Sequence, residues 1–190
     1  MQQIAIFASG TGSNARKIIE YFADHPTVRV SLVVSNRSTA PVLDMAAENG
    51  VPTLVISRSN FYESEDILQA LATIELVVLA GFLWLIPPYL VKAFPQRIVN
   101  IHPALLPKYG GKGMYGMNVH RAVSEAQEAT SGMTIHYVNE VYDEGQIIFQ
   151  ASCQLVPGEA AENIAKKVLS LEHQHFAPVI EQLLTKKDRS

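Results

Sequence analysis

The chain has 190 residues with a net charge of −3 at pH 7, and 48% of them are hydrophobic. This suits one domain with a full core, argues against a nucleic-acid partner, and, with Cys153 as the single cysteine, excludes an internal disulfide or a multi-cysteine zinc site. No apolar run reaches the ~18 residues of a membrane span and no basic signal-like segment opens the chain, so we expect a cytoplasmic protein that does not enter membranes.

Apolar runs and helical patterns alternate along the first hundred residues. Runs typical of buried strands occupy 4–8, 28–34, 53–56 and 76–80, and apolar residues recur at helical spacing within 15–22, 41–50 and 60–71. We expect Pro41 to start its helix and Gly50 to close it. A capping box of Asn60 and Glu63 predicts the start of the third helix. Another short helix is expected from Pro87-Pro88.

The second half changes character after a strand that begins at Ile98. A mobile loop is predicted over 109–117, which holds four glycines, followed by a helix capped by Asn118 and ending near Ala129. Two antiparallel strands are expected over 133–138 and 146–155, then a helix over 160–184 that Pro178 breaks or kinks near Ala177. The order predicts an α/β fold: one domain over 1–190 with a Rossmann-like, doubly wound, mostly parallel sheet and late antiparallel strands.

Asn100 and His102 stand two residues apart where the strand from Ile98 ends. In an extended chain their side chains point to the same side, and this edge of an open α/β sheet usually carries the chemistry. The alternative is that the two side chains only form hydrogen bonds within an ordinary loop and have no role in a reaction.

A glycine turn, Gly10 to Asn14, lies between the first strand and the first helix. Its backbone N–H groups at a helix start suit a phosphate, and with Ala15 it fits the dinucleotide pattern G-x-G-x-x-G/A. An NAD site would need an acidic residue ~20 positions on. That region reads Ser35-Asn36-Arg37, which leaves NADP possible. A single phosphate is favoured, and a tight turn that binds nothing is the alternative.

Large apolar residues fill the loop after the fourth strand, where loops normally become polar. Leu83 to Ile86 include the single tryptophan, Trp84. Such a loop lines a pocket for a flat ring or packs against a neighbouring helix.

His136 and Asp143 lie on and just after the first late strand. Each alone is most often structural, Asp143 as a turn former. If Asp143 reaches His102, its carboxylate should raise the pKa of the histidine and keep it charged. Beside the Asn100 amide, this pair could stabilise an oxyanion and pass protons.

Together these motifs resemble the phosphoribosylglycinamide formyltransferase family, the folate-dependent enzymes of purine synthesis. The resemblance spans residue 3 to about 184. Its motifs are Ser9-Gly10-Thr11-Gly12-Ser13-Asn14, Val78-Leu79-Ala80-Gly81-Phe82, Asn100-Ile101-His102-Pro103-Ala104-Leu105-Leu106-Pro107, Ile135-His136-Tyr137-Val138 and Asp143-Glu144-Gly145.

The resemblance implies formyl transfer from the co-substrate 10-formyltetrahydrofolate to the amine of 5'-phosphoribosylglycinamide, with no metal. The implied catalytic residues are Asn100 and His102, which hold the oxyanion, and Asp143, which relays the amine's proton through water. Phosphoribosylglycinamide would meet Gly12, Ser13, Asn14 and Glu172. The folate would meet Leu83, Trp84, Leu85, Ile86, Asn100, Asn139, Glu140, Val141, Tyr142 and Asp143, and His136 and His120 would support the site.

Three features depart from the family. Trp84 stands where many members have a basic residue, Ser64 stands where some have an arginine, and the 109–117 loop is longer. The sequence therefore does not show which residues would contact the acidic tail of the folate.

Other functions stay in view. Formyltetrahydrofolate deformylase carries an N-terminal regulatory domain, and methionyl-tRNA formyltransferase a C-terminal nucleic-acid-binding domain. Neither is expected in a chain that begins at its first strand and ends near 190. An NADP-binding oxidoreductase or a non-catalytic phosphate-binding module would leave Asn100, His102 and Asp143 without a role. Small-molecule substrates and a monomer or homodimer are expected.

Overall fold

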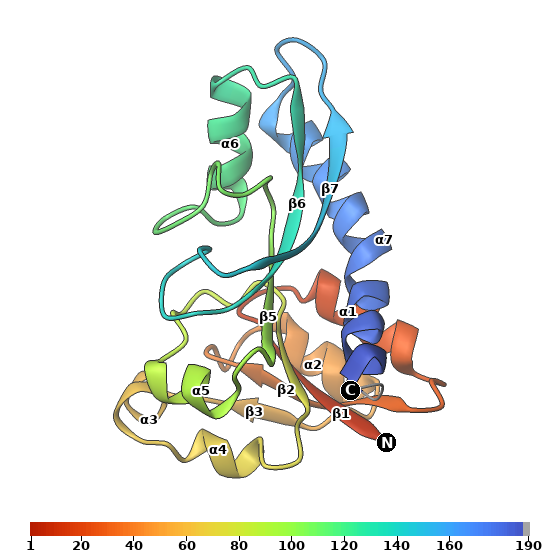
Figure 1. Ribbon diagram of the computed structural model, residues 1–190, viewed down its shortest axis with the longest axis vertical. Helices are drawn as coiled ribbons and strands as arrows, with labels where there is room; N and C mark the ends of the chain where they lie inside the picture. The colour runs from red at the N-terminus through yellow and green to blue at the C-terminus, as the bar shows by residue number, and fades with distance from the viewer. Residues whose placement is uncertain (188–190) are drawn as a thin grey trace.

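Seven strands form one sheet in the order β3-β2-β1-β4-β5-β6-β7 (Figure 1). In the computed structural model, which describes residues 1–187, β1 to β5 run parallel and β6 and β7 are antiparallel additions. The predicted doubly wound sheet with late antiparallel strands is confirmed. The strands are β1 Gln2–Phe7, β2 Val28–Ser35, β3 Thr53–Val55, β4 Leu76–Leu79, β5 Ile98–His102, β6 Thr130–Tyr137 and β7 Ile147–Gln154.

Helices cover both faces of the sheet, and the long α7 runs along one of them (Figure 1). One core layer joins the sheet to α1, α2 and α7, with Phe176 and Ile180 among its buried residues. The other joins it to α3, α4 and α5 around Phe61 and Leu90. The helices are α1 Ser13–Phe22, α2 Pro41–Glu48, α3 Arg58–Glu63, α4 Ile67–Ala70, α5 Pro88–Ala93, α6 Met117–Glu125 and α7 Ala161–Lys187.

The chain order reverses beside β1, because β2 pairs with one of its edges and β4 with the other. Such a switch point opens a crevice at the carboxyl ends of the strands. The glycine turn after β1 and the apolar loop after β4 meet there. Ser9 N–H donates to the Gly81 carbonyl at 3.0 Å, and Leu83 N–H donates to Ser9 Oγ at 3.0 Å.

The helix predicted over 60–71 is two short helices, and its predicted cap is wrong. Ser57 caps α3, since its Oγ accepts from the Asn60 N–H at 3.2 Å, so Asn60 lies inside the helix. Ser64 is extended, with φ −133°, and separates α3 from α4. A serine two residues after the end of β3 caps the helix, three residues before the asparagine predicted to do so.

Asn118 is not the cap of α6 either. Gly116 takes that position with φ 52°, and the Asn118 side chain donates to the Gly113 carbonyl at 3.1 Å. The helix ends at Glu125 rather than Ala129, because β6 already pairs with β7 from Thr130.

Of the break or kink predicted near Ala177, the break is wrong, because the last helix does not end at Pro178. α7 is continuous through Pro178. Phe176, Ala177, Val179 and Ile180 are all buried in the core around it. The burial of these apolar residues offsets the cost of the backbone hydrogen bond that the proline removes. No helix within 1–187 is long and apolar enough to cross a membrane.

Candidate active site

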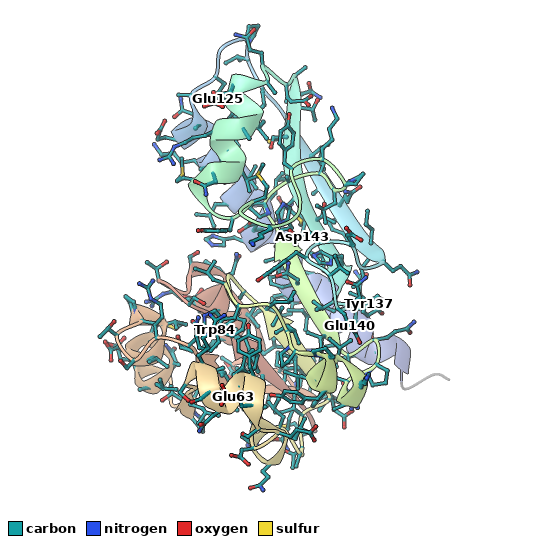
Figure 2. The ribbon with its side chains drawn as sticks, turned by 90° about the vertical axis from the view of Figure 1, so that its left-hand side faces the viewer. Glu63, Trp84, Glu125, Tyr137, Glu140 and Asp143 are labelled. Carbon is teal, nitrogen blue, oxygen red and sulfur yellow. The ribbon has the colours of Figure 1, made fainter. Side chains whose placement is uncertain are left out.

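A cleft of about 790 Å³ opens at the carboxyl ends of β1, β4 and β5. Asn100, His102 and Asp143 all line it. Figure 2 shows Asp143 on the upper lobe and Trp84 below it, two residues from opposite walls of this cleft.

The three residues predicted to be catalytic meet in the cleft. Nδ1 of His102 lies 3.4 Å from Oδ2 of Asp143, and the Asn100 amide donates to Oδ1 of Asp143 at 3.5 Å. His102 is 3% exposed, so this contact is largely shielded from water. Asn100 and His102 come from one strand, whereas Asp143 comes from the connection between β6 and β7.

His136 fixes the orientation of the Asn100 amide. Its Nδ1 donates to the Tyr137 carbonyl at 2.8 Å, so its Nε2 is left to accept from the Asn100 amide nitrogen at 3.1 Å. The β5–β6 register places Asn100 directly opposite His136. His136 Nε2 also lies 3.6 Å from Asp143 Oδ1. The expected supporting position of His136 therefore has a geometric basis.

Backbone geometry places the Asp143 carboxylate. Asp143 has a left-handed φ of 56°, and its Oδ2 accepts from the Gly111 N–H at 2.9 Å. A Cβ at Gly145 would collide with the Tyr137 carbonyl, so the connection passes too close to β6 for any other residue. A second cavity of about 420 Å³ also touches Asp143. Asp143 therefore lies between the main cleft and this second cavity.

Burial decides the charge state of His102. Desolvation lowers the pKa of His102 below its ordinary value, and Asp143 and the Tyr109 carbonyl, which pull it up, do not outweigh burial. Burial pushes the pKa of Asp143 up, but His136, His102 and the Gly111 N–H together lower it. The predicted raised pKa and charged state of His102 are therefore wrong: the pair is a neutral imidazole beside a carboxylate.

Asn14 and Glu172, two residues predicted to bind phosphoribosylglycinamide, meet at the end of the cleft beside the glycine turn. Asn14 Nδ2 donates to Glu172 Oε2 at 2.7 Å across 158 residues of sequence, and both residues line the cleft. Burial raises the pKa of Glu172, opposed by this hydrogen bond. The Asn14 Oδ1 is buried with no partner in the described chain. The side chains of Asn14 and Glu172 thus place polar atoms side by side at this end of the cleft.

Gly12 and Ser13 lie in the turn but are not among the residues that line the cleft. Gly12 is buried with φ 75°, and a Cβ there would collide with Val42. Gly10 and Thr11 face the cleft instead, together with the expected supporting residue His120. Burial and then His102 lower the pKa of His120, and its Nδ1 has no partner within the described residues.

The apolar end combines pocket and core, the two alternatives left open by the sequence. Leu83, Trp84, Leu85 and Ile86 all line the cleft, yet Ile86 is 2% exposed and belongs to the core. Asn139, Val141 and Tyr142 form the facing wall. Glu140 is exposed and does not line the cleft.

Several cleft groups carried no sequence signal. The Tyr109 carbonyl accepts from His102 Nε2 at 2.8 Å, and backbone groups are invisible in a motif. Lys112 lines the cleft from the glycine-rich loop and likewise had no sequence signal. Arg37, which the sequence did single out as compatible with NADP, follows β2 and lines the cleft as well. Within residues 1–187 no cluster of three or more His, Cys, Asp or Glu side chains could hold a metal ion.

Comparisons with known proteins match this chain to formyl transferases. The formyl transferase family model matches residues 2–180. The chain is 43% identical over 188 residues to "Phosphoribosylglycinamide formyltransferase, chloroplastic" of Arabidopsis thaliana, covering 94% of this chain and 64% of that protein. It is 34% identical to the Haemophilus influenzae phosphoribosylglycinamide formyltransferase, covering 95% and 86%. The chain thus spans less than two thirds of the length of the Arabidopsis relative.

Solved structures agree with the fold. The phosphoribosylglycinamide formyltransferase of Anaplasma phagocytophilum superposes with a TM-score of 0.88 at 31% identity, covering 97% of this chain and 87% of that one. Glycinamide ribonucleotide transformylase 1 of Geobacillus kaustophilus gives a TM-score of 0.86 at 36% identity, covering 97% and 99%.

Proposed function

The chain belongs to the formyl transferase family, and from this we propose that it transfers a formyl group from 10-formyltetrahydrofolate to the amine of 5'-phosphoribosylglycinamide. The observation that carries the proposal is the meeting of Asn100, His102 and Asp143 in one cleft. The names of the relatives give formyl transfer to phosphoribosylglycinamide as the activity of those proteins.

The two ends of the cleft match the two substrates in chemistry. Backbone N–H groups of the glycine turn, of which Gly10, Thr11 and Asn14 line the cleft, suit the phosphate. Glu172 and the Asn14 side chain offer hydrogen-bond partners for a sugar. Trp84 and its apolar neighbours suit the faces of a flat ring system, and the polar groups of 139–143 suit the donors and acceptors on its edge. The reacting carbon and nitrogen would then meet beside the catalytic residues.

Asn100 and His102 would stabilise the negative oxygen of the tetrahedral intermediate. The amine nitrogen forms a bond to the formyl carbon, whose carbonyl electrons move onto oxygen, and the carbon–nitrogen bond to the folate then breaks. A neutral His102 serves here as an N–H donor, as neutral histidines can in low-dielectric sites. Of the two Asn100 N–H bonds, the one to Asp143 is the longer at 3.5 Å, so it is the donor available to the substrate.

Asp143 would accept the proton that the attacking amine loses. Its lowered pKa keeps it ionised at neutral pH. The proton then passes, through water, to the folate nitrogen that leaves, so the overall reaction consumes and releases no net proton. The second cavity beside Asp143 supports a place for such water.

An assay with both substrates tests the proposal. Purified protein receives 10-formyltetrahydrofolate with phosphoribosylglycinamide, with water alone, or with the same sugar phosphate lacking the glycinamide amine. Formylated phosphoribosylglycinamide should appear only in the first reaction, with tetrahydrofolate in equal amount. Release of formate at the same rate without the amine would make the protein a hydrolase, the deformylase-like alternative. A cytoplasmic location and a monomer or homodimer stay predictions.

A further inference from the structure

An arginine with no acidic partner lies beside the apolar end of the cleft. Arg58, the first residue of α3, is exposed and takes part in none of the ion pairs among residues 1–187. Its guanidinium carbon lies 5.2 Å from the ring centre of Tyr62 and 5.9 Å from that of Trp84. A cation over two aromatic faces is held in orientation while its N–H groups stay free.

The two rings are fixed to the cleft wall. The Tyr62 hydroxyl donates to the Leu85 carbonyl at 2.9 Å, and Trp84 packs against Phe61 with ring centres 5.7 Å apart. Trp84 and Leu85 both line the cleft. In Figure 2, Trp84 lies between α3, which ends at the labelled Glu63, and the part of the upper lobe that holds Asp143.

Tyr62 also connects this corner to the opposite wall. Burial raises the pKa of its hydroxyl, Tyr142 raises it further, and Arg58 lowers it, so both residues lie close to it. Tyr142 belongs to the facing wall of the cleft. Arg58 therefore sits where a long ligand would leave the apolar end and emerge into water.

We propose that Arg58 binds the carboxylates of the glutamyl tail of the formyl donor, an inference that rests on the proposed function. A folate whose rings lie against the apolar loop directs its anionic tail outward, and a planar guanidinium matches a carboxylate through two parallel hydrogen bonds. Arg58 thus supplies the positive charge that Trp84 and Ser64 do not.

Arg37 and Lys112 line the cleft and form no ion pair within residues 1–187, but they are in the wrong place for this role. Arg37 follows β2, beside the glycine turn at the end of β1, and Lys112 adjoins Gly111, which binds Asp143. Both therefore belong to the phosphate end and the catalytic centre.

Binding measurements with two ligands test the inference. Dissociation constants are measured by calorimetry for tetrahydrofolate and for its tail diamide, in which both glutamyl carboxylates are neutral amides. Arg58→Met should weaken tetrahydrofolate about 5- to 10-fold and leave the diamide unchanged. The matched control is Arg29→Met, which removes the same charge at the amino end of β2. The cleft lies at the carboxyl ends of the strands, so this change should alter neither constant.

Equal weakening of both ligands by Arg58→Met would mean that the arginine only supports the wall and would overturn the inference. Unchanged binding of tetrahydrofolate would overturn it as well. In both cases the proposed function stands, because the wild-type protein still binds folate. A wild-type protein that binds neither compound overturns the proposed function and this inference with it.

Discussion

The Nε2 atom of His102 lies 2.8 Å from the main-chain oxygen of Tyr109. Because a carbonyl oxygen only accepts, Nε2 carries the proton, and the Nδ1 of the neutral ring is the atom that faces Asp143 at 3.4 Å. In the neutral ring Nδ1 has no proton to donate to the carboxylate, so the Nε2–H group is the single donor of His102, and the Tyr109 carbonyl already accepts from it. For His102 to bind a formyl oxygen, the Tyr109 carbonyl has to move away. Tyr109 is the first residue of the 109–117 loop and has a strained left-handed φ of 58°, and the glycines that follow it allow the backbone to take other conformations.

Asp143→Asn should lower kcat at least about 1,000-fold with little change in melting temperature. The amide keeps the size of the carboxylate but cannot accept a proton from the amine. Steady-state kinetics and thermal unfolding check this. Glu144→Gln, the same change at the exposed neighbouring residue, is the control and should keep full activity. Wild-type turnover by Asp143→Asn would remove Asp143 from the reaction.

His102→Ala should lower kcat at least about 100-fold, as the loss of one oxyanion donor does in other enzymes. The KM for phosphoribosylglycinamide should change little, because His102 lies away from the Asn14–Glu172 pair that would bind the sugar. His25→Ala serves as the control, since His25 pairs with Glu181 and does not line the cleft. A rise in KM alone would contradict the assigned role.

Glu172→Gln should stabilise the protein and weaken its substrate binding. A raised folded-state pKa means that the stability contributed by the protonated carboxyl is lost as pH rises through that pKa. At neutral pH a buried charge therefore costs stability, and the glutamine amide can also donate to the unpaired Asn14 Oδ1.

We expect a gain of about 1 kcal/mol for Glu172→Gln, or about 2–4 °C in melting temperature. The KM for phosphoribosylglycinamide should rise. Glu162→Gln, on the exposed side of the same helix, is the control and should change neither quantity. A lower melting temperature for Glu172→Gln would show that the carboxylate stabilises the fold.

Stability should fall as the solution is acidified below the ordinary histidine pKa of 6.5. Burial lowers the pKa of His102, His120 and His173, so the unfolded chain binds more protons than the folded one between those lowered values and 6.5. The stability that comes from keeping these rings neutral is present above 6.5 and is lost below it. The stability that comes from the ionised Asp143 is lost only in stronger acid, because the pKa of its carboxyl is lowered.

Melting temperatures measured from about pH 8 to about pH 5.5 test this, in a Glu172→Gln background that removes the opposing carboxyl. The curve should fall toward acid, and His120→Asn should make it flatter. An increase in melting temperature on acidification would contradict the conclusion that burial keeps these three histidines neutral.

Much of the fold followed from local patterns. The first five strands and the proline start of α2 were predictable, because apolar periodicity and proline geometry act over a few residues. The predicted helix caps at Asn60 and Asn118 were wrong, since nearby Ser57 and Gly116 took those positions in context. The predicted break at Pro178 was wrong because tertiary packing of α7 outweighs a local preference.

The sequence by itself determined that Asn100 and His102 share one side of a strand end, because two-residue spacing in a strand fixes direction. It also placed a glycine turn after the first strand and an apolar loop after the fourth, and the tertiary structure made these two strands neighbours. Only the tertiary structure brought Asp143 to His102, joined Asn14 to Glu172 across 158 residues and stacked Arg58 on Trp84. It also reversed the expected pKa shift of His102. The reason is that distance and desolvation depend on how distant segments pack, whereas periodicity depends only on neighbours along the chain.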